Sequence, residues 1–306
     1  MRFLNVLLAV SFLSVAFVSC SMEDDMLNVV PASETAVVSA DDTQLYVSFN
    51  VADSDVATRT SVSSASVVVF EGNNVYFAQD NVTSFEDVKV LLKTNRAYEV
   101  YVVANTSTSF EGLATREAVM NQPLHANDLA NLVKSGSSNF TFAKGQGFET
   151  IAEASKNVET VNIHLYQLTA QVQLKQFNVN VKENTYGTVV LTGVKLINKN
   201  TARTLNATGA SFTNESVNSL EAASFVTYPN NDKNNLTAME LTFTVDGKED
   251  SRTYTINHKD GKFVEAGNIY QLHVTVNVVG SSVDCSVKCN VLDWQYNEFE
   301  TSLVEL

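Results

Sequence analysis

The side chains that most often do chemistry in proteins are scattered along this 306-residue chain. None of its four histidines has a metal-ligand spacing; they are His125, His164, His258 and His273. The sequence also lacks the G-x-S-x-G turn of a hydrolase, a phosphate-binding glycine loop and the H-E-x-x-H pattern of a zinc protease. The acidic pairs Asp41-Asp42 and Glu249-Asp250 fit polar turns better than calcium sites. We therefore predict a protein that is not an enzyme and that carries no cofactor and no metal.

Two of the three cysteines, Cys285 and Cys289, lie in a run in which every second residue is apolar, from Val283 to Val291. This alternation is typical of a strand and places both thiols on one face. Four residues of strand span roughly 13 Å, which is beyond the ~7 Å Cα separation that a disulfide tolerates. We therefore predict two small core residues, neither a bridge nor a metal pair.

The third cysteine, Cys20, closes an N-terminal segment typical of an export signal. Arg2 supplies a positive end, and residues 3–18 are nearly all apolar but too few to span a membrane. The segment ends in Phe17-Val18-Ser19-Cys20, which resembles a bacterial lipobox, although Phe17 departs from the usual Leu-type residue. We predict a signal peptide over residues 1–19 and lipidation of Cys20. An ordinary secretory signal with an incidental cysteine is the alternative.

The segment after Cys20 is acidic and shows no clear periodicity up to residue 43. We interpret residues 20–43 as a lipidated tether. Its first residues, Ser21-Met22-Glu23-Asp24-Asp25, resemble the surface-export signal of Bacteroides-type lipoproteins; a solvated linker is the alternative.

The composition favours a β-rich acidic protein with real hydrophobic cores. The chain is 44% hydrophobic and 18% charged, with 12 Gly and 3 Pro. At about 100–200 residues per domain, its length predicts two domains. Its net charge of −14 repels nucleic acid and anionic membrane, so neither is an expected partner. A soluble acidic extracellular protein is the simplest class that fits.

Residues 44–60, QLYVSFNVADSDVATRT, combine a predicted strand with a predicted cleavage site. Apolar side chains alternate with polar ones in the first half, as in a strand with one face in a core; they are Leu45, Val47, Phe49 and Val51. The polar run 52–66 that follows carries one basic residue, Arg59, which suits a proteolytic nick between Arg59 and Thr60. Cleavage there would release a strand that the fold needs, which makes sense if another strand replaces it.

Further elements complete a first domain of about 44–160. We expect a hairpin at 66–78, strands at 88–92 and 98–104, helices at 114–121 and 127–134, and a strand that includes Phe140 and Phe142. Asn127 or Asp128 is the expected N-cap of the second helix. Arg96 and Arg116, the other basic cleavage candidates, fall in or beside these elements, where a protease has poorer access.

The second domain is expected at 161–306, after a polar junction at Ser155–Glu159. The apolar phase of residues 161–174 slips near Gln167, which indicates a bulge or bend in one long strand. Short strands separated by frequent turns favour a sandwich; we expect them at 188–197, 224–228, 238–245, 252–257, 269–278 and 283–291.

The C-terminal segment 292–306 is strand-like and has no following element to pair with. Its apolar residues alternate in two phases around Asn297-Glu298; they are Leu292, Trp294, Tyr296, Phe299 and Leu303. Such a strand can be donated to a neighbour by β-augmentation, or it can close the sheet of its own domain. Both alternatives stay open at this point.

Taken together, these residues resemble the fimbrillin family, the lipoprotein-precursor pilins of Bacteroides-type bacteria that build type V pili. The shared features lie along nearly the whole chain; they are Cys20, the strand Leu45–Val51, Thr58-Arg59-Thr60, residues 161–174, Gly267–Tyr270 and Asp293-Trp294. Tyr166 and Gln167 depart from the family, in which an arginine often precedes the corresponding strand.

The resemblance implies an all-β fold of two transthyretin-like β-sandwich domains, with a small helical insertion in the first. It also implies a precursor carried to the outer membrane and cut after Arg59 by an arginine-specific protease. The lost strand would be replaced by the C-terminal strand of another subunit, in a homo- or hetero-polymer on the cell surface. The alternatives are a non-polymerising anchor or tip adhesin, or a monomeric surface lipoprotein that binds a glycan or a host protein.

Overall fold

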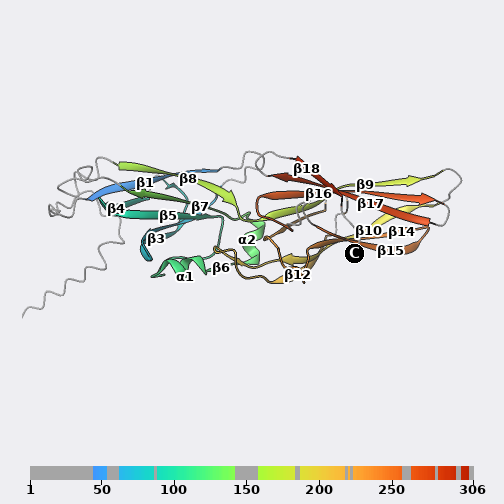
Figure 1. Ribbon diagram of the computed structural model, residues 1–306, viewed down its shortest axis with the longest axis horizontal. Coiled ribbons are helices and arrows are strands. Elements are labelled where there is room, and N and C mark those ends of the chain that lie inside the picture. The colour runs from blue at the N-terminus through green and yellow to red at the C-terminus, as the bar shows by residue number, and fades with distance from the viewer. Residues whose placement is uncertain are drawn as a thin grey trace, which may run out of the picture.

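The computed structural model describes residues 44–53, 62–85, 88–141, 158–182, 187–217, 220, 223–256, 263–279, 282–293 and 298–302. Figure 1 shows an elongated molecule in which strands dominate and two strand-built halves follow each other along the long axis. The expected all-β class is therefore confirmed. Within the ranges given above, both helices have five residues, so neither has the length of a membrane span.

The first half, here called the first sandwich, is a seven-stranded sheet in the order β3-β2-β5-β7-β8-β1-β4. Its strands are β1 (Gln44–Asp53), β2 (Ala65–Glu71), β3 (Asn74–Val82), β4 (Lys89–Lys93), β5 (Ala97–Ala104), β7 (Lys134–Thr141) and β8 (Val158–Gln167). The pairing between β7 and β8 covers two residue pairs, Lys134↔Gln167 and Ser135↔Tyr166. One apolar core takes side chains from both sides of this narrow junction, so the sheet folds over on itself as a sandwich.

Gly136 is the residue that lets β7 and β8 cross so closely. A Cβ atom on Gly136 would lie 2.1 Å from the carbonyl oxygen of His164, and a backbone atom cannot yield as a side chain does. The glycine is therefore required by close approach of two strands.

The predicted hairpin at 66–78 is confirmed, because β2 pairs with β3 across a turn with Gly72 at φ 61°. The strands expected at 88–92 and 98–104 are found as β4 and β5. The turn between them has Asn95 at φ 57°, but the two strands do not pair with each other. Glycine and asparagine are the residues that adopt this left-handed conformation most readily.

The helical insertion is confirmed, but its helices are shorter than predicted. They are α1 (Arg116–Met120) and α2 (Ala126–Ala130). The expected N-cap of α2 is wrong: His125 is the N-cap, and the carboxylate of Asp128, in the first turn, accepts from the His125 N–H at 2.9 Å. The expected end of α2 is also wrong, because Leu132 takes φ 54° and Lys134 begins β7.

The expected domain junction at 155–159 is wrong in position. Residues 161–167 were assigned to the second domain, but they belong to β8, which pairs with β1 and β7 in the first sandwich. The chain passes to the other half at Leu168 and Thr169, between β8 and β9 (Ala170–Val181). The phase slip near Gln167 is thus a change of sheet, not a bulge within one strand.

The second half, here called the second sandwich, has two sheets. One has the order β12-β10-β14-β15 and the other the order β13-β9-β16-β17-β18. Their remaining bounds are β10 (Val189–Asn200), β12 (Phe212–Val217), β13 (Ser224–Thr227), β14 (Ala238–Val245), β15 (Lys248–Thr255), β16 (Asn268–Val279), β17 (Ser282–Asp293) and β18 (Glu298–Ser302). The strand expected at 238–245 is confirmed as β14, in which Met239, Leu241 and Phe243 are fully buried.

The expectation that the strand cysteines are core residues is confirmed for Cys289, which is fully buried in the core of the second sandwich. Cys285, also on β17, is partly buried against the same core. Burial raises the pKa of the Cys289 thiol to about 12.

A third core joins the two halves. The short strands β6 (Pro123–Leu124) and β11 (Arg203–Thr204) pair with each other across the junction (Figure 1). Around them, one apolar cluster takes residues from both sandwiches, including Phe110, Leu129, Leu205 and Tyr228. The two sandwiches therefore share buried surface and are not joined by a free linker.

Candidate strand-exchange site

The first strand, β1, is paired along both of its edges. It runs parallel to β8, from Tyr46↔Val158 to Asp53↔Leu165, and antiparallel to β4, from Gln44↔Lys93 to Ser48↔Lys89. Figure 1 shows β1 beside β8 at the end of the molecule far from the second sandwich. An element near the start of the described chain thus occupies an inner position of a sheet.

Phe49 anchors β1 in the core of the first sandwich. Its side chain is 3% exposed and belongs to a cluster with β8 and β4 residues and the residue just before β4, which are Val161, Ile163, Leu165, Val90, Leu92 and Val88. The other three residues of the predicted displaced strand are placed by their backbone register: Leu45 pairs with Leu92, Val47 with Val90 and Val51 with Ile163. The structure does not describe their side chains.

Removing β1 would open a slot one strand wide between β8 and β4. β1 is the one strand that pairs with β4 in the described part of the chain, and β7 pairs with β8 at two residues. Strands lie ~4.8 Å apart, so β8 and β4 would face each other across about 10 Å. Their backbone groups would lose hydrogen-bond partners and the core would lose Phe49, so the slot would favour an apolar replacement strand.

The β4 side of this slot carries positive charge. Lys89 and Lys93 are paired in register with Ser48 and Gln44 of β1, which are both neutral. The C-terminal residues 294–306 contain three glutamates and no basic residue. A strand from that segment would therefore bring negative charge towards the two lysines, which the present occupant does not.

The structure divides the predicted donor segment in two. Leu292 is partly buried in β17, where it pairs with Ile269 on one side and Glu298 on the other. Neighbouring β17 residues Val287 and Val291 are buried in the core. Phe299 lies in β18, an edge strand whose described partner is β17 alone. Trp294, Tyr296 and Leu303 lie outside the described residues.

In this structure β18 therefore pairs within its own sheet, as the second of the two alternatives drawn from the sequence requires. Donation would require β18 to leave that edge, whereas β17 would have to stay because it carries core side chains.

The predicted processing sites lie outside the described residues. This applies to Cys20, Arg59 and Thr60. The two competing arginines are described, and both are engaged: Arg96 forms an ion pair with Glu71, and Arg116 pairs with Glu99 and lies 5.3 Å from the centre of the Phe70 ring. The position of Arg116 at the start of α1 agrees with the expectation of poorer protease access, whereas the Arg96 side chain is 49% exposed in the turn before β5 and does not.

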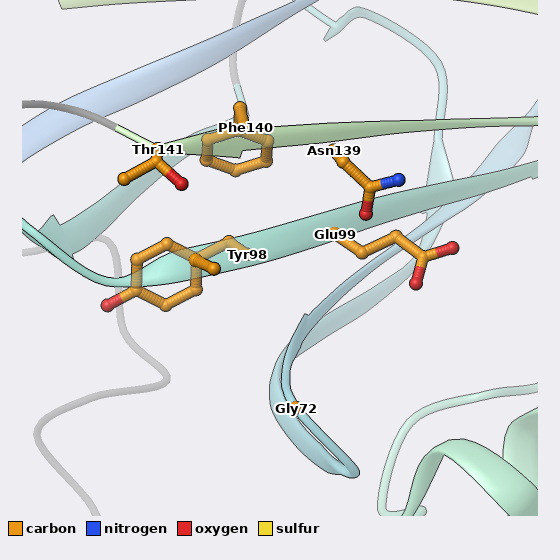
Figure 2. A pocket seen from close by; sticks show the side chains of 7 residues that line it. Gly72, Tyr98, Glu99, Asn139, Phe140 and Thr141 are labelled. Atoms are coloured by element: carbon orange, nitrogen blue, oxygen red, sulfur yellow. The ribbon is translucent and has the colours of Figure 1, made fainter.

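A hollow of about 390 Å³ lies on the first sandwich over the ends of β5 and β7 (Figure 2). The Tyr98 and Phe140 rings stack with centroids 5.8 Å apart. Burial raises the pKa of the Tyr98 hydroxyl, and the hydroxyl accepts a hydrogen bond from the Lys93 N–H at 3.2 Å. The one carboxylate that lines the hollow, Glu99, is paired with Arg116. The hollow thus offers no free acid–base pair among its lining residues.

Residues that could hold a metal do not gather in the described ranges, since no three His, Cys, Asp or Glu side chains come together there. The candidate functional site is therefore the position of β1 between β8 and β4, here called the seat of β1, and not a cavity with reactive groups.

Solved structures share the overall fold of the chain. A fimbrillin from Porphyromonas gingivalis has a TM-score of 0.56 at 12% identity and covers 84% of this chain and 99% of its own. The chain has the fimbrillin fold. A fimbrial assembly protein from Parabacteroides distasonis gives 0.54 at 16% identity, with 86% and 100% covered. A candidate cell adhesion protein from Bacteroides eggerthii gives 0.55 at 18% identity, with 87% and 99% covered.

At these identities the likeness concerns the fold, and it confirms the fold that the resemblance implied. No protein-family model and no curated protein matches the chain.

Proposed function

We propose that this chain is a structural subunit of a cell-surface pilus. It is exported as a lipoprotein precursor with the lipid on Cys20, cleaved after Arg59, and polymerised by strand exchange with the C-terminal strand of another subunit. The fimbrillin fold supports a role in a pilus or in adhesion at the cell surface.

One observation carries the proposal: β1 is an inner strand of the first sandwich, yet it precedes the predicted cleavage site by only a few residues. It ends at Asp53, and Arg59 follows within the connection to β2. Cleavage after Arg59 would cut β1 free from the rest of the sheet. The slot between β8 and β4 would then be open to a new strand. Hydrolysis of one peptide bond would therefore control when the subunit can bind a partner.

The C-terminal segment has the length to fill this slot. Residues 294–306 number 13 and span roughly 43 Å as a strand, whereas the ten residues of β1 span roughly 33 Å. We also move the start of the proposed donor. Because Leu292 belongs to a core strand, we place the first donated residue at Trp294.

The proposed partners are other pilus subunits of the same or another kind, an arginine-specific maturation protease, and host surface proteins or glycans that the finished pilus contacts. The proposed location is the outer membrane and then the fimbrium on the cell surface.

A second candidate is an anchor or tip adhesin that keeps its first strand, or a monomeric surface lipoprotein that binds a glycan or a host protein. The pairing of β18 with β17 favours this candidate, because β1 and β18 then each pair within a sheet of their own chain.

Proteolysis separates the two. The chain from residue 20 onward, with Cys20→Ser, keeps every described residue and is incubated with an arginine-specific protease. A pilin loses the residues up to Arg59 and then forms ladders that resist mild heating in detergent. The matched control Arg59→Ala stays uncut and monomeric.

A second variant tests the donor. Deletion of residues 294–306 removes β18 but leaves β17 intact, so we expect a folded chain that is cleaved and forms no ladder. Cleaved parent chain that remains monomeric, or a deletion variant that still forms ladders, would overturn the proposal.

A further inference from the structure

The outer part of β9 has one unpaired edge in the described part of the chain. On one side β9 is paired with β16 as far as Val181↔Val278. On the other side β13 pairs only with residues 170–173, and the last backbone hydrogen bond joins Leu174 N–H to the carbonyl of Ala223 at 2.9 Å. Lys175 is the extra residue of an irregularity, and regular strand resumes at Gln176. A free, regular edge therefore runs over Gln176–Val181.

This edge exposes apolar side chains that lie on the core side of the sheet. Phe177, Val179 and Val181 pair in register with Val274, Val276 and Val278, which are buried. Val179 is nevertheless 37% exposed and Val181 41% exposed. A hollow of about 400 Å³, lined by Phe177, Leu191 and Leu220 among others, continues the apolar strip inward. Such an edge is a template for another strand.

We propose that β9 pairs antiparallel with β9 of a second copy of this chain, about a two-fold axis at Val179. Val179 is the centre of the seven residues Gln176–Lys182, QFNVNVK. In this register Phe177 lies opposite Val181 of the second copy, Asn178 opposite Asn180, and Val179 opposite itself. Apolar residues meet apolar residues on the core side, and amides meet amides on the outer side. The interface is self-complementary, as two-fold symmetry requires.

Neighbouring registers are worse matched. A shift of the axis to Asn178 places Lys175 opposite Val181. A shift to Asn180 places Lys182 opposite Asn178 and leaves Phe177 opposite position 183, which lies past the end of β9 at Val181. With the axis at Val179, each Lys182 faces Gln176, so no two lysines are opposed. Like charges directly opposite each other destabilise a strand pair, and this register avoids them.

The outer face already carries a ladder of amides that the second copy would extend. Gln176 donates to the Asn178 side chain at 3.0 Å, and Asn180 donates to Asn277 on β16 at 3.2 Å. Pairing would add an Asn178–Asn180 contact on each side of the two-fold axis. The product is a continuous sheet across both copies, with the edge closed and the exposed valines covered.

The proposal does not rest on cleavage or on the C-terminal segment. Its surface lies at the outer end of the second sandwich, whereas the seat of β1 lies in the first (Figure 1). An experiment can therefore disprove either of the two interfaces without affecting the other.

Disulfide trapping tests the register. Opposed residues of an antiparallel pair have Cα atoms about 4.5–5.5 Å apart, within the range that a disulfide accepts. In the uncleaved Cys20→Ser chain, Val179→Cys should form a covalent dimer under mild oxidation. The matched control is Val190→Cys, because Val190 is 49% exposed but belongs to β10. The parent chain controls for Cys285 and Cys289.

We expect several-fold more dimer from Val179→Cys than from Val190→Cys. Sedimentation of the parent chain should show a reversible dimer, and Val179→Lys, which opposes two charges at the axis, should be monomeric with an unchanged melting temperature. Equal trapping of both cysteines, or a parent chain that sediments as a monomer at every concentration, would overturn the proposal. Ladder formation by Val179→Lys after protease treatment reports on the pilus proposal alone.

Discussion

The hydroxyl of Tyr228 donates a hydrogen bond to the backbone carbonyl of His125 at 3.1 Å, and so joins the second sandwich to the first. Tyr228 is fully buried, and this burial raises the pKa of its hydroxyl, which keeps it a neutral donor. Nearby, the guanidinium of Arg203 donates to the carbonyl of Leu168 at 2.9 Å, at the point where the chain passes between the sandwiches. Polar contacts thus fix the orientation of a junction whose stability comes from a shared apolar core.

We expect Tyr228→Phe to lower the free energy of unfolding by about 0.5–1.5 kcal/mol, because the His125 carbonyl loses its donor while the ring still packs. Urea denaturation measures the change. Tyr166→Phe is the control, since Tyr166 is 53% exposed. Equal effects of the two substitutions would show that the hydroxyl at the junction contributes nothing of its own.

We expect Gly136→Ala to destabilise the first sandwich by about 1–3 kcal/mol, as overpacked sites do. The added Cβ atom would lie 2.1 Å from the His164 carbonyl oxygen, so β7 and β8 would have to separate. Thermal unfolding of the variant measures this loss. Gly193→Ala serves as the control, because its Cβ atom would approach Thr242 no closer than 3.3 Å; a similar loss there would remove the argument from close approach.

The sequence predicted strands well where alternation is strict, and it predicted partners poorly. Leu241 and Phe243 on β14 show why the first succeeds: an alternating strand with one buried face has a period that few other structures share. Residues Val161–Leu165 show why the prediction of strand partners fails. Their alternation indicates which face of the strand is buried, but not which strand lies alongside. β8 pairs with β1, more than a hundred residues earlier, and nothing local encodes that.

At the candidate site, too, the sequence predicted the strand but not its pairing partners. The alternation of residues 45–51 predicted a strand with a buried face, and Phe49 is buried. Its seat between β8 and β4 could not be predicted, since it depends on two long-range pairings. The N-cap of α2 was misplaced for a different reason: Asp128 is as good a cap residue as any, but its carboxylate is engaged by Ser107 N–H at 2.8 Å as well as by His125.

The buried thiol of Cys289 gives a prediction for alkaline pH. Its pKa rises from 9.0 to about 12 on burial. Above pH 9.0 the unfolded chain loses this proton while the folded chain keeps it, so stability falls as the pH rises towards 12. A tenfold difference in acidity between the two states corresponds to about 1.4 kcal/mol. We therefore expect Cys289→Ala to have a shallower loss of stability over this window.

Urea denaturation under reducing conditions at a series of pH values measures the slope. Cys285→Ala is the matched control on the same face of β17. Identical slopes for Cys289→Ala and the parent chain would mean that the thiol does not ionise differently in the two states.

Substitution of Phe49 should affect the stability of the uncut precursor but not that of the assembled form. In the uncut chain, Phe49→Ala removes a buried ring from the first core and should lower the free energy of unfolding by about 3–5 kcal/mol. If cleavage after Arg59 discards β1, the ladders formed afterwards do not contain residue 49 and should dissociate at the same temperature as those of the parent.

Phe77→Ala is the control for this pair of measurements. Phe77 is buried in the same core but lies on β3, which the cleaved chain retains. It should therefore weaken both the precursor and the ladders. Ladders of Phe49→Ala that melt as early as those of Phe77→Ala would mean that β1 stays in the assembled subunit. The seat would then never be vacated, and the C-terminal segment would have to bind elsewhere.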